Sequence, residues 1–159
     1  MATFTTAQYD LQKTDRANIS RLATPNVASG TVEFAVIKYT LAGTEAANDI
    51  IKLCVLPAGC IPLPQLSSCI ANTDPSAGTL TLDIGTAEDP DGWANDILMA
   101  TGAHALATSG TFPAWVEPTA IAADTGSGNA VVYATVAAAS ASPDAGDILY
   151  FTLAYKRGR

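Results

Sequence analysis

The chain has 159 residues, of which 48% are hydrophobic and only 14% are charged, and its formal net charge is −7. This is the size of one domain, and it is long enough to bury a core without disulfides or metal ions. Between Leu22 and Tyr155 two lysines face thirteen carboxylates, so this body carries −11, whereas the two ends together carry +4. An acidic body repels phosphates over about 8 Å at physiological salt, so nucleic acid is not an expected partner. The cationic ends favour docking by the termini, and the alternative is that they are basic by chance.

No membrane partner is expected either. The amino-terminal sequence has no cationic segment followed by an apolar stretch, and the chain contains no run of about 18 apolar residues. We therefore expect synthesis in a reducing cytoplasm. Three cysteines, Cys54, Cys60 and Cys69, cannot form a closed set of disulfides, and their spacing fits no usual zinc site. We interpret them as buried, free thiols and expect no metal and no cofactor.

Residues 1–30 are predicted to be an extended N-terminal arm that leads to one domain over residues 31–159. The segment has few large apolar side chains, shows no sustained period of two, and is interrupted by Pro25 and Gly30. A short first strand within residues 3–11 is the alternative. Three bases of the arm, Lys13, Arg16 and Arg21, are the candidate partner-binding residues.

Strand-like patterns begin at Thr31. In residues 31–41, β-branched and aromatic side chains occupy both parities, which predicts a strand covered on both faces. Residues 79–86 alternate cleanly, with Leu80, Leu82 and Ile84 on one side, which predicts one wet face. Further strands are predicted over 49–57, 130–137 and 147–156, weak pairing over 65–71, and a proline-interrupted strand over 112–123.

Turns and one ambiguous element separate these strands. Residues 57–65 contain three prolines and are predicted to be loop or sheet edge, and residues 88–92 (EDPDG) are predicted to be a turn. Residues 96–106 could form a short helix, although Thr101 and Gly102 disfavour it. Seven or so strands without helical crossovers predict an all-β fold, a β-sandwich or jelly-roll-like single domain.

The residues that carry chemistry are sparse. His104 is the sole histidine and has no nucleophile motif around it, so we interpret it as structural. Asp89, Asp91 and Gly92 resemble half of a calcium loop, but the remaining ligands of such a loop are missing. We therefore predict no catalytic residues and no enzymatic activity.

Several segments together resemble the small virion proteins of tailed bacteriophages, in particular head decoration or cement proteins with a jelly-roll-like body. These are VEFAVIKYTLAGTEAANDIIKLCVLPAGC, TLTLDIGTAEDPDGWA and GDILYFTLAYKRG, behind a polar arm. The resemblance implies a non-enzymatic structural protein, a homotrimer, that binds the major capsid protein on the exterior of the virion and stabilises the shell. A decoration protein could attach through its arm by adding a strand to a neighbour's sheet edge.

A second class of function stays open at this point. A β-sandwich can also be a carbohydrate- or receptor-binding module of a head fibre or tail, and Trp93 and Trp115 could stack on a sugar ring. Packing in the core or at an interface is the interpretation that we favour for both tryptophans.

Overall fold

A computed structural model of the chain describes residues 2–5, 32–72, 80–106, 121–123, 128–139 and 143–157. In these residues the secondary structure is β-strand, apart from one 3₁₀ turn, η1 (Pro64–Leu66), and none of it is a helix long and apolar enough to cross a membrane. The prediction of an all-β fold is confirmed. The strands are β1 (Thr3–Thr5), β2 (Val32–Thr40), β3 (Ile50–Pro57), β4 (Ile61–Pro62), β5 (Ser68–Ala71), β6 (Thr81–Gly85), β7 (Ala94–Leu98), β8 (Gly102–Ala105), β9 (Asn129–Ala138) and β10 (Ile148–Lys156).

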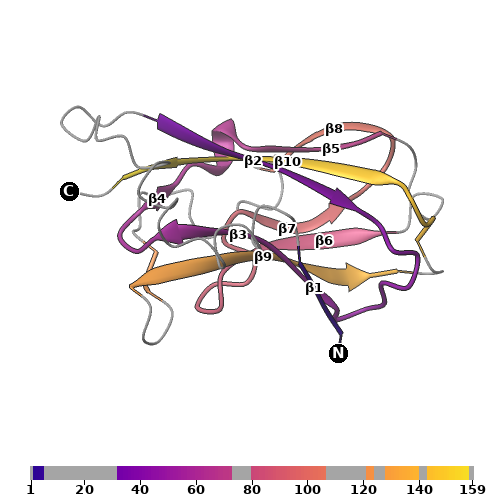
Figure 1. Ribbon diagram of the computed structural model, residues 1–159. Coiled ribbons are helices and arrows are strands. Elements are labelled where there is room, and N and C mark those ends of the chain that lie inside the picture. Colours follow the sequence, from indigo (N-terminus) through magenta and orange to yellow (C-terminus); the bar gives the residue numbers. More distant parts are fainter. Residues whose placement is uncertain are drawn as a thin grey trace.

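The strands form two sheets that pack face to face (Figure 1). One sheet has the order β2-β10-β5-β8, with β4 also paired to β10, and the other has the order β1-β3-β9-β6-β7. The antiparallel pairs are nested in the sequence: β6 with β7, β5 with β8, β3 with β9, and β2 with β10. This nesting is what a long hairpin produces when it rolls into two sheets, and it defines a jelly roll. The strand β1 is added parallel to β3.

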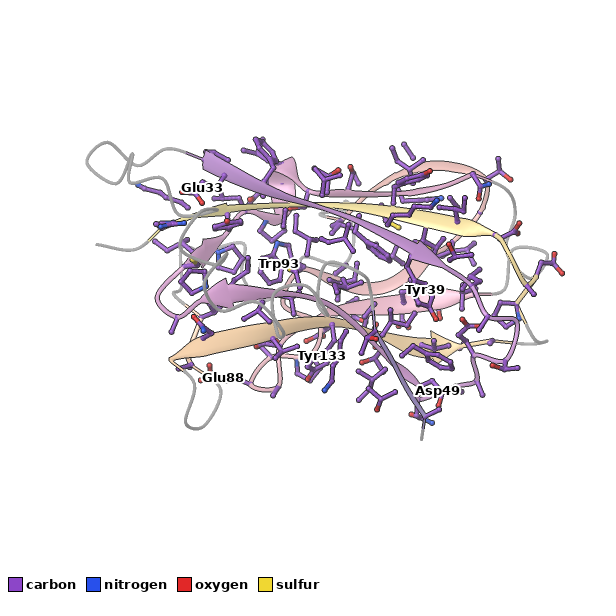
Figure 2. All side chains as sticks on the ribbon, viewed as in Figure 1. Glu33, Tyr39, Asp49, Glu88, Trp93 and Tyr133 are labelled. Carbon is purple, nitrogen blue, oxygen red and sulfur yellow. The ribbon has the colours of Figure 1, made fainter. Side chains whose placement is uncertain are left out.

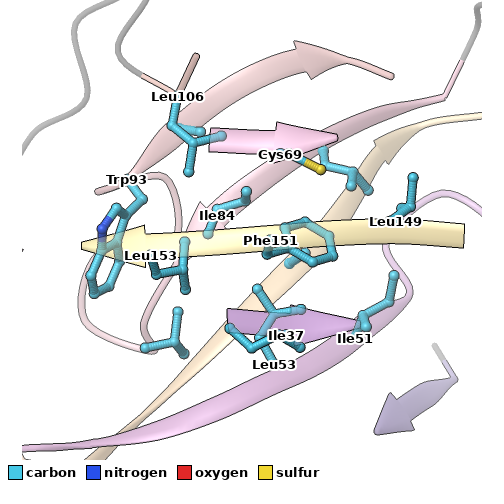
Figure 3. Packing of buried hydrophobic residues seen from close by; sticks show 14 of the residues in the cluster. Ile37, Ile51, Leu53, Cys69, Ile84, Trp93, Leu106, Leu149, Phe151 and Leu153 are labelled. Carbon is cyan, nitrogen blue, oxygen red and sulfur yellow. The ribbon is translucent and has the colours of Figure 1, made fainter. Parts of the chain in front are cut away.

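The core lies between the two sheets and is built by the period of two. On β10, Leu149, Phe151 and Leu153 are completely buried. Phe151 lies beside Ile37 of the neighbouring strand β2, and Leu53 on β3 belongs to the opposite sheet (Figure 3). Burial of one such side chain stabilises the fold by about 1.5–3 kcal/mol. The predicted alternation of residues 79–86 is confirmed, because Leu80, Leu82 and Ile84 are all buried.

Residues 96–106 form no helix. The strands β7 and β8 occupy this segment, separated by a short connection. Asp96 has a φ of 52° and Gly102 a φ of 120°, values that an α-helix does not allow. These two residues break the alternation along the segment, which is why its pattern did not indicate strands.

Some expectations fall outside the described residues. Thr3–Thr5 form β1, within the range where a short first strand was the alternative. The remainder of the predicted arm, from residue 6, lies outside the described residues, as does most of the predicted strand over residues 112–123. Residues 57–65 contain β4 and the start of η1, as expected for loop or sheet edge.

Candidate interaction surface

The outer face of the β2-β10-β5-β8 sheet is apolar. Phe34 and Val36 on β2 are 54% and 66% exposed, and Ile70 on β5 and Tyr150 on β10 are 41% and 38% exposed. The register places Val36 opposite Thr152, and Tyr150 opposite Ile70. Residues opposite each other in register lie on one face of a sheet and contact each other. Phe34, Val36, Ile70 and Tyr150 therefore lie on one face of the sheet, with Thr152 beside Val36 on the same face, and they are here named the apolar face.

The apolar face corrects one prediction from the sequence. Residues 31–41 were expected to be covered on both faces, and only the side that carries Ile37 and Tyr39 is covered. Phe34 and Val36, on the opposite parity of β2, remain exposed. The prediction was wrong for the chain alone. Apolar residues at both alternating positions show that both faces of the strand are apolar, but they do not show which molecule covers each face.

The charges around the apolar face are few. Glu33 is the one carboxylate on β2, β10, β5 and β8, and it is paired with Arg157 at 3.0 Å and accepts a hydrogen bond from the Tyr155 hydroxyl at 2.9 Å. Lys38 lies opposite Tyr150, whereas Lys156 lies opposite Val32, six positions away along β2. At about 3.3 Å per residue, the two lysines stand roughly 20 Å apart. The face therefore has an uncharged centre and a lysine toward each end.

The opposite side of the molecule is acidic. Five carboxylates lie on β6, on β7 and in the connection between them, here named the acidic turn: Asp83, Glu88, Asp89, Asp91 and Asp96. Figure 2 shows Glu88 on the side of the sandwich away from β2 and β10. Burial raises the pKa of Asp83, and burial together with a hydrogen bond to Asp91 raises the pKa of Asp89 to about 6.

The backbone of the acidic turn is fixed by close contacts. A Cβ on Gly85 would lie 2.1 Å from the carbonyl oxygen of Asp89, so only glycine fits there. The backbone N–H of Thr86 donates to that same oxygen at 2.9 Å, and the hydroxyl of Tyr133 donates to the carbonyl of Thr86 at 2.6 Å. The prediction of a turn over residues 88–92 is confirmed. No group of three or more potential metal ligands occurs among the described residues.

The two ends of the described chain leave the body at opposite ends of the sandwich. At one end, Asp49 accepts hydrogen bonds from the backbone N–H groups of Ala2, at 2.7 Å, and Ala46, at 3.0 Å. These bonds keep the pKa of Asp49 below its usual value and hold β1 against β3. At the other end, Glu33 binds Arg157, which follows β10. Figure 2 shows Glu33 and Asp49 far apart.

One buried carboxylate organises the connection between β2 and β3. Glu45 is almost completely buried, and its oxygens accept hydrogen bonds from the Tyr39 hydroxyl at 2.7 Å and from the backbone N–H groups of Ala42 at 2.6 Å and Gly43 at 2.9 Å. Burial and the contact with Glu45 raise the pKa of Tyr39 well above its usual range. Glu45 therefore has a structural role, because its carboxylate oxygens already accept hydrogen bonds from the Tyr39 hydroxyl and from backbone N–H groups of the connection.

The other candidate residues have structural positions. The Nε2 atom of His104 lies 2.7 Å from the carbonyl oxygen of Ala100. Trp93 is completely buried between the sheets (Figure 3), so it cannot stack on a sugar ring. Trp115 lies outside the described residues.

The three cysteines are buried and unpaired, as the sequence predicted. Burial raises the pKa of Cys54 and of Cys69 to about 12, and that of Cys60 to about 11. The thiolates, which are the reactive and metal-binding forms, are therefore scarce at neutral pH.

The predicted partner-binding residues Lys13, Arg16 and Arg21 lie outside the described residues. The apolar face was not singled out from the sequence, although its signal was present. That signal is the apolar character of both parities of residues 31–41, together with the low content of charged residues.

Two solved structures share this arrangement of strands. A chain of "Capsid of Ralstonia phage GP4" aligns with 99% of this chain and 99% of its own length, at a TM-score of 0.65 and 22% identity. The chain shares its fold with a phage capsid chain. A chain of "Cyanophage Pam1 capsid asymmetric unit" aligns with 85% of this chain and 91% of its own, at a TM-score of 0.55 and 21% identity. No family model and no curated protein matches the sequence.

Proposed function

We propose that this chain is a non-enzymatic structural protein of a phage virion. The observation that carries the proposal is the full-length fold match to a chain from a phage capsid, at a TM-score of 0.65. The surface supports it, because the described molecule presents an apolar face and an acidic turn as its two distinctive surfaces. Fold alone does not fix a function, so the proposal rests also on this surface chemistry.

Within that role, the finer proposal is a decoration or cement protein. The chain would be made in the host cytoplasm, bind the major capsid protein on the exterior of the assembled shell as a homo-oligomer, most simply a trimer, and stabilise the shell. A ligand that binds only the assembled lattice stabilises it by mass action. Linking several copies multiplies attachment by about 10² to 10⁴ through effective concentration.

The charge distribution supports attachment through the termini. The body between Leu22 and Tyr155 carries −11, whereas Lys13, Arg16 and Arg21 make the amino-terminal segment basic. Basic residues on a terminal segment of the sequence can bind an acidic neighbour without bringing the acidic body close to it. Such contacts weaken as salt screens them.

The test replaces all three bases, Lys13→Ala, Arg16→Ala and Arg21→Ala, in the full-length chain. Binding to shells that lack the protein, measured by co-sedimentation, is expected to weaken, with the largest loss at low salt. Substitution is preferable to truncation at Gly30, because truncation would also remove β1 and its contact with Asp49.

The matched control is Lys38→Ala, which removes an exposed cation from the body. Its binding is expected to stay close to that of the unmodified chain, because Lys38 lies on β2 of the body and not on the amino-terminal segment that the proposal assigns to attachment. Full attachment of the triple variant at every salt concentration would show that the arm does not bind the capsid. Failure of the unmodified chain to bind any shell would contradict the decoration role.

A further inference from the structure

The apolar face has the composition of a protein–protein interface. Interface cores are depleted in charge and rich in aromatic and large apolar side chains, with a polar rim. Here Phe34, Val36, Ile70 and Tyr150 form the centre, and Lys38 and Lys156 stand toward the ends. Monomeric proteins rarely expose contiguous apolar patches larger than a few hundred Å². The expectation that β2 is covered on both faces is met only if another molecule supplies the second cover.

The strand β2 offers a second route of contact at the same place. Within the described residues it lies at the edge of its sheet, and its nine residues pair with β10 from Val32 to Thr40 without a bulge. Its sequence contains no proline. Long, regular edge strands of this kind pair readily with a strand of another chain. The equivalent edge of the other sheet, along β3, is instead covered by β1.

Charge makes the apolar face a side on which a second copy of this chain can bind with little repulsion between carboxylates. The chain is acidic, at −7, so two copies repel each other wherever their carboxylates meet. The acidic turn lies on β6 and β7, in the opposite sheet, and the apolar face itself carries lysines and no unpaired carboxylate. When two copies meet through the apolar face, their acidic turns lie on the outer sides of the pair. The turns are then separated by the thickness of two sandwiches, and the two sheets of each sandwich are about 10 Å apart. That separation exceeds the screening length of about 8 Å at physiological salt.

We propose that the apolar face, with the adjoining edge of β2, is the surface through which copies of this chain associate with one another in solution. The proposal rests on the proposed function in one respect: the proposed function includes a homo-oligomer, and this inference names the interface of that oligomer. It needs no capsid, so it can be tested on the free protein.

The experiment measures the mass of the full-length protein by light scattering over a range of concentrations. Val36→Lys places a charge at the centre of the apolar face and is expected to raise the dissociation constant at least about tenfold. Ile70→Lys, on β5, is expected to act in the same direction. The matched control is Leu98→Lys, because Leu98 is 47% exposed on β7, in the other sheet, and its replacement is expected to leave the mass unchanged.

All three side chains are exposed, so the variants are expected to fold, and circular dichroism with thermal melting checks this. A monomeric unmodified chain at every concentration overturns the proposal, as does an unchanged mass of both face variants or equal dissociation of Leu98→Lys. If the unmodified chain is monomeric and Val36→Lys loses shell binding, the face docks on the capsid instead, which also overturns it. An oligomer that dissociates on Val36→Lys but never binds shells supports this proposal and contradicts the decoration role.

Discussion

At the scale of single residues, Glu45 shows how a charge can be buried in this molecule. Its carboxylate is satisfied by one hydroxyl and by backbone N–H groups of its own loop, at 2.6–2.9 Å. Hydrogen bonds to an ionised acceptor are stronger than those between neutral groups. A polar side chain in a loop sequence gave no indication that it would be buried, because its partners are mostly backbone groups, which every sequence contains.

Tyr39→Phe tests the contribution of the Tyr39–Glu45 hydrogen bond to stability. The variant keeps the buried ring and removes the hydroxyl that donates to Glu45, so the free energy of unfolding is expected to fall by about 1.5–3 kcal/mol. Urea unfolding measures it. Tyr150→Phe is the control, because Tyr150 is exposed on the apolar face, and its loss is expected to stay within about 0.5 kcal/mol. Equal effects of the two substitutions would show that the Tyr39–Glu45 contact does not stabilise the fold.

At the scale of elements, the connection between β6 and β7 brings carboxylates close together, and their mutual repulsion disfavours the ionised form of Asp89. The pKa of Asp89 is raised from 3.8 to about 6 by burial, by its hydrogen bond to Asp91 and by the neighbouring charges. The folded state therefore binds a proton more tightly than the unfolded state between about pH 4 and pH 6. Over this window the free energy of unfolding falls as the pH rises, because the unfolded chain releases the proton more readily.

Asp89→Asn is expected to remove this fall. The variant should melt at a higher temperature than the unmodified chain at pH 7, and the difference should vanish toward pH 4, below which Asp89 is protonated in both states. Melting temperature measured across that range checks the prediction. Asp144→Asn, in an exposed position before β10, is the control and should run parallel to the unmodified chain. A variant that is less stable at pH 7 would contradict the prediction.

The elements also show what the sequence can predict. The strands β6 and β10 were predictable because one parity is consistently apolar and is buried, as at Leu82 and Phe151. The strands β7 and β8 were not, because they are short and Asp96 and Gly102 adopt positive φ angles that break the period. The apolar face was visible in residues 31–41 as apolar residues on both parities, but which molecule covers each face depends on partners outside the chain.

At the scale of the whole molecule, the three cysteines come from separate segments and all lie in the core. We expect that none of the three thiols of the folded protein reacts with a thiol reagent such as Ellman's reagent. Unfolding is expected to make all three thiols reactive. The physical reason is burial, which both blocks access and holds the thiol pKa values at about 11–12.

The same interpretation predicts that neither reductant nor chelator changes the melting temperature. A decrease of several degrees with EDTA would instead indicate a metal site, and the same decrease with dithiothreitol would indicate a disulfide. Reaction of one thiol in the folded state would show that its segment opens locally.

The nested pairing of strands also determines when this protein can fold during its synthesis. The central strand β10 joins β2, β4 and β5, and among the described strands it is the last to leave the ribosome. Ile148 lies opposite Thr40 and Lys156 opposite Val32, so the partner of β2 exists only after all the described strands between them have been synthesised. Contacts between residues so far apart in sequence form slowly. Until β10 has been synthesised, Phe34 and Val36 belong to a nascent strand that lacks this partner. Neighbouring ribosomes on one message therefore expose such strands to one another before either protein has closed its sheet.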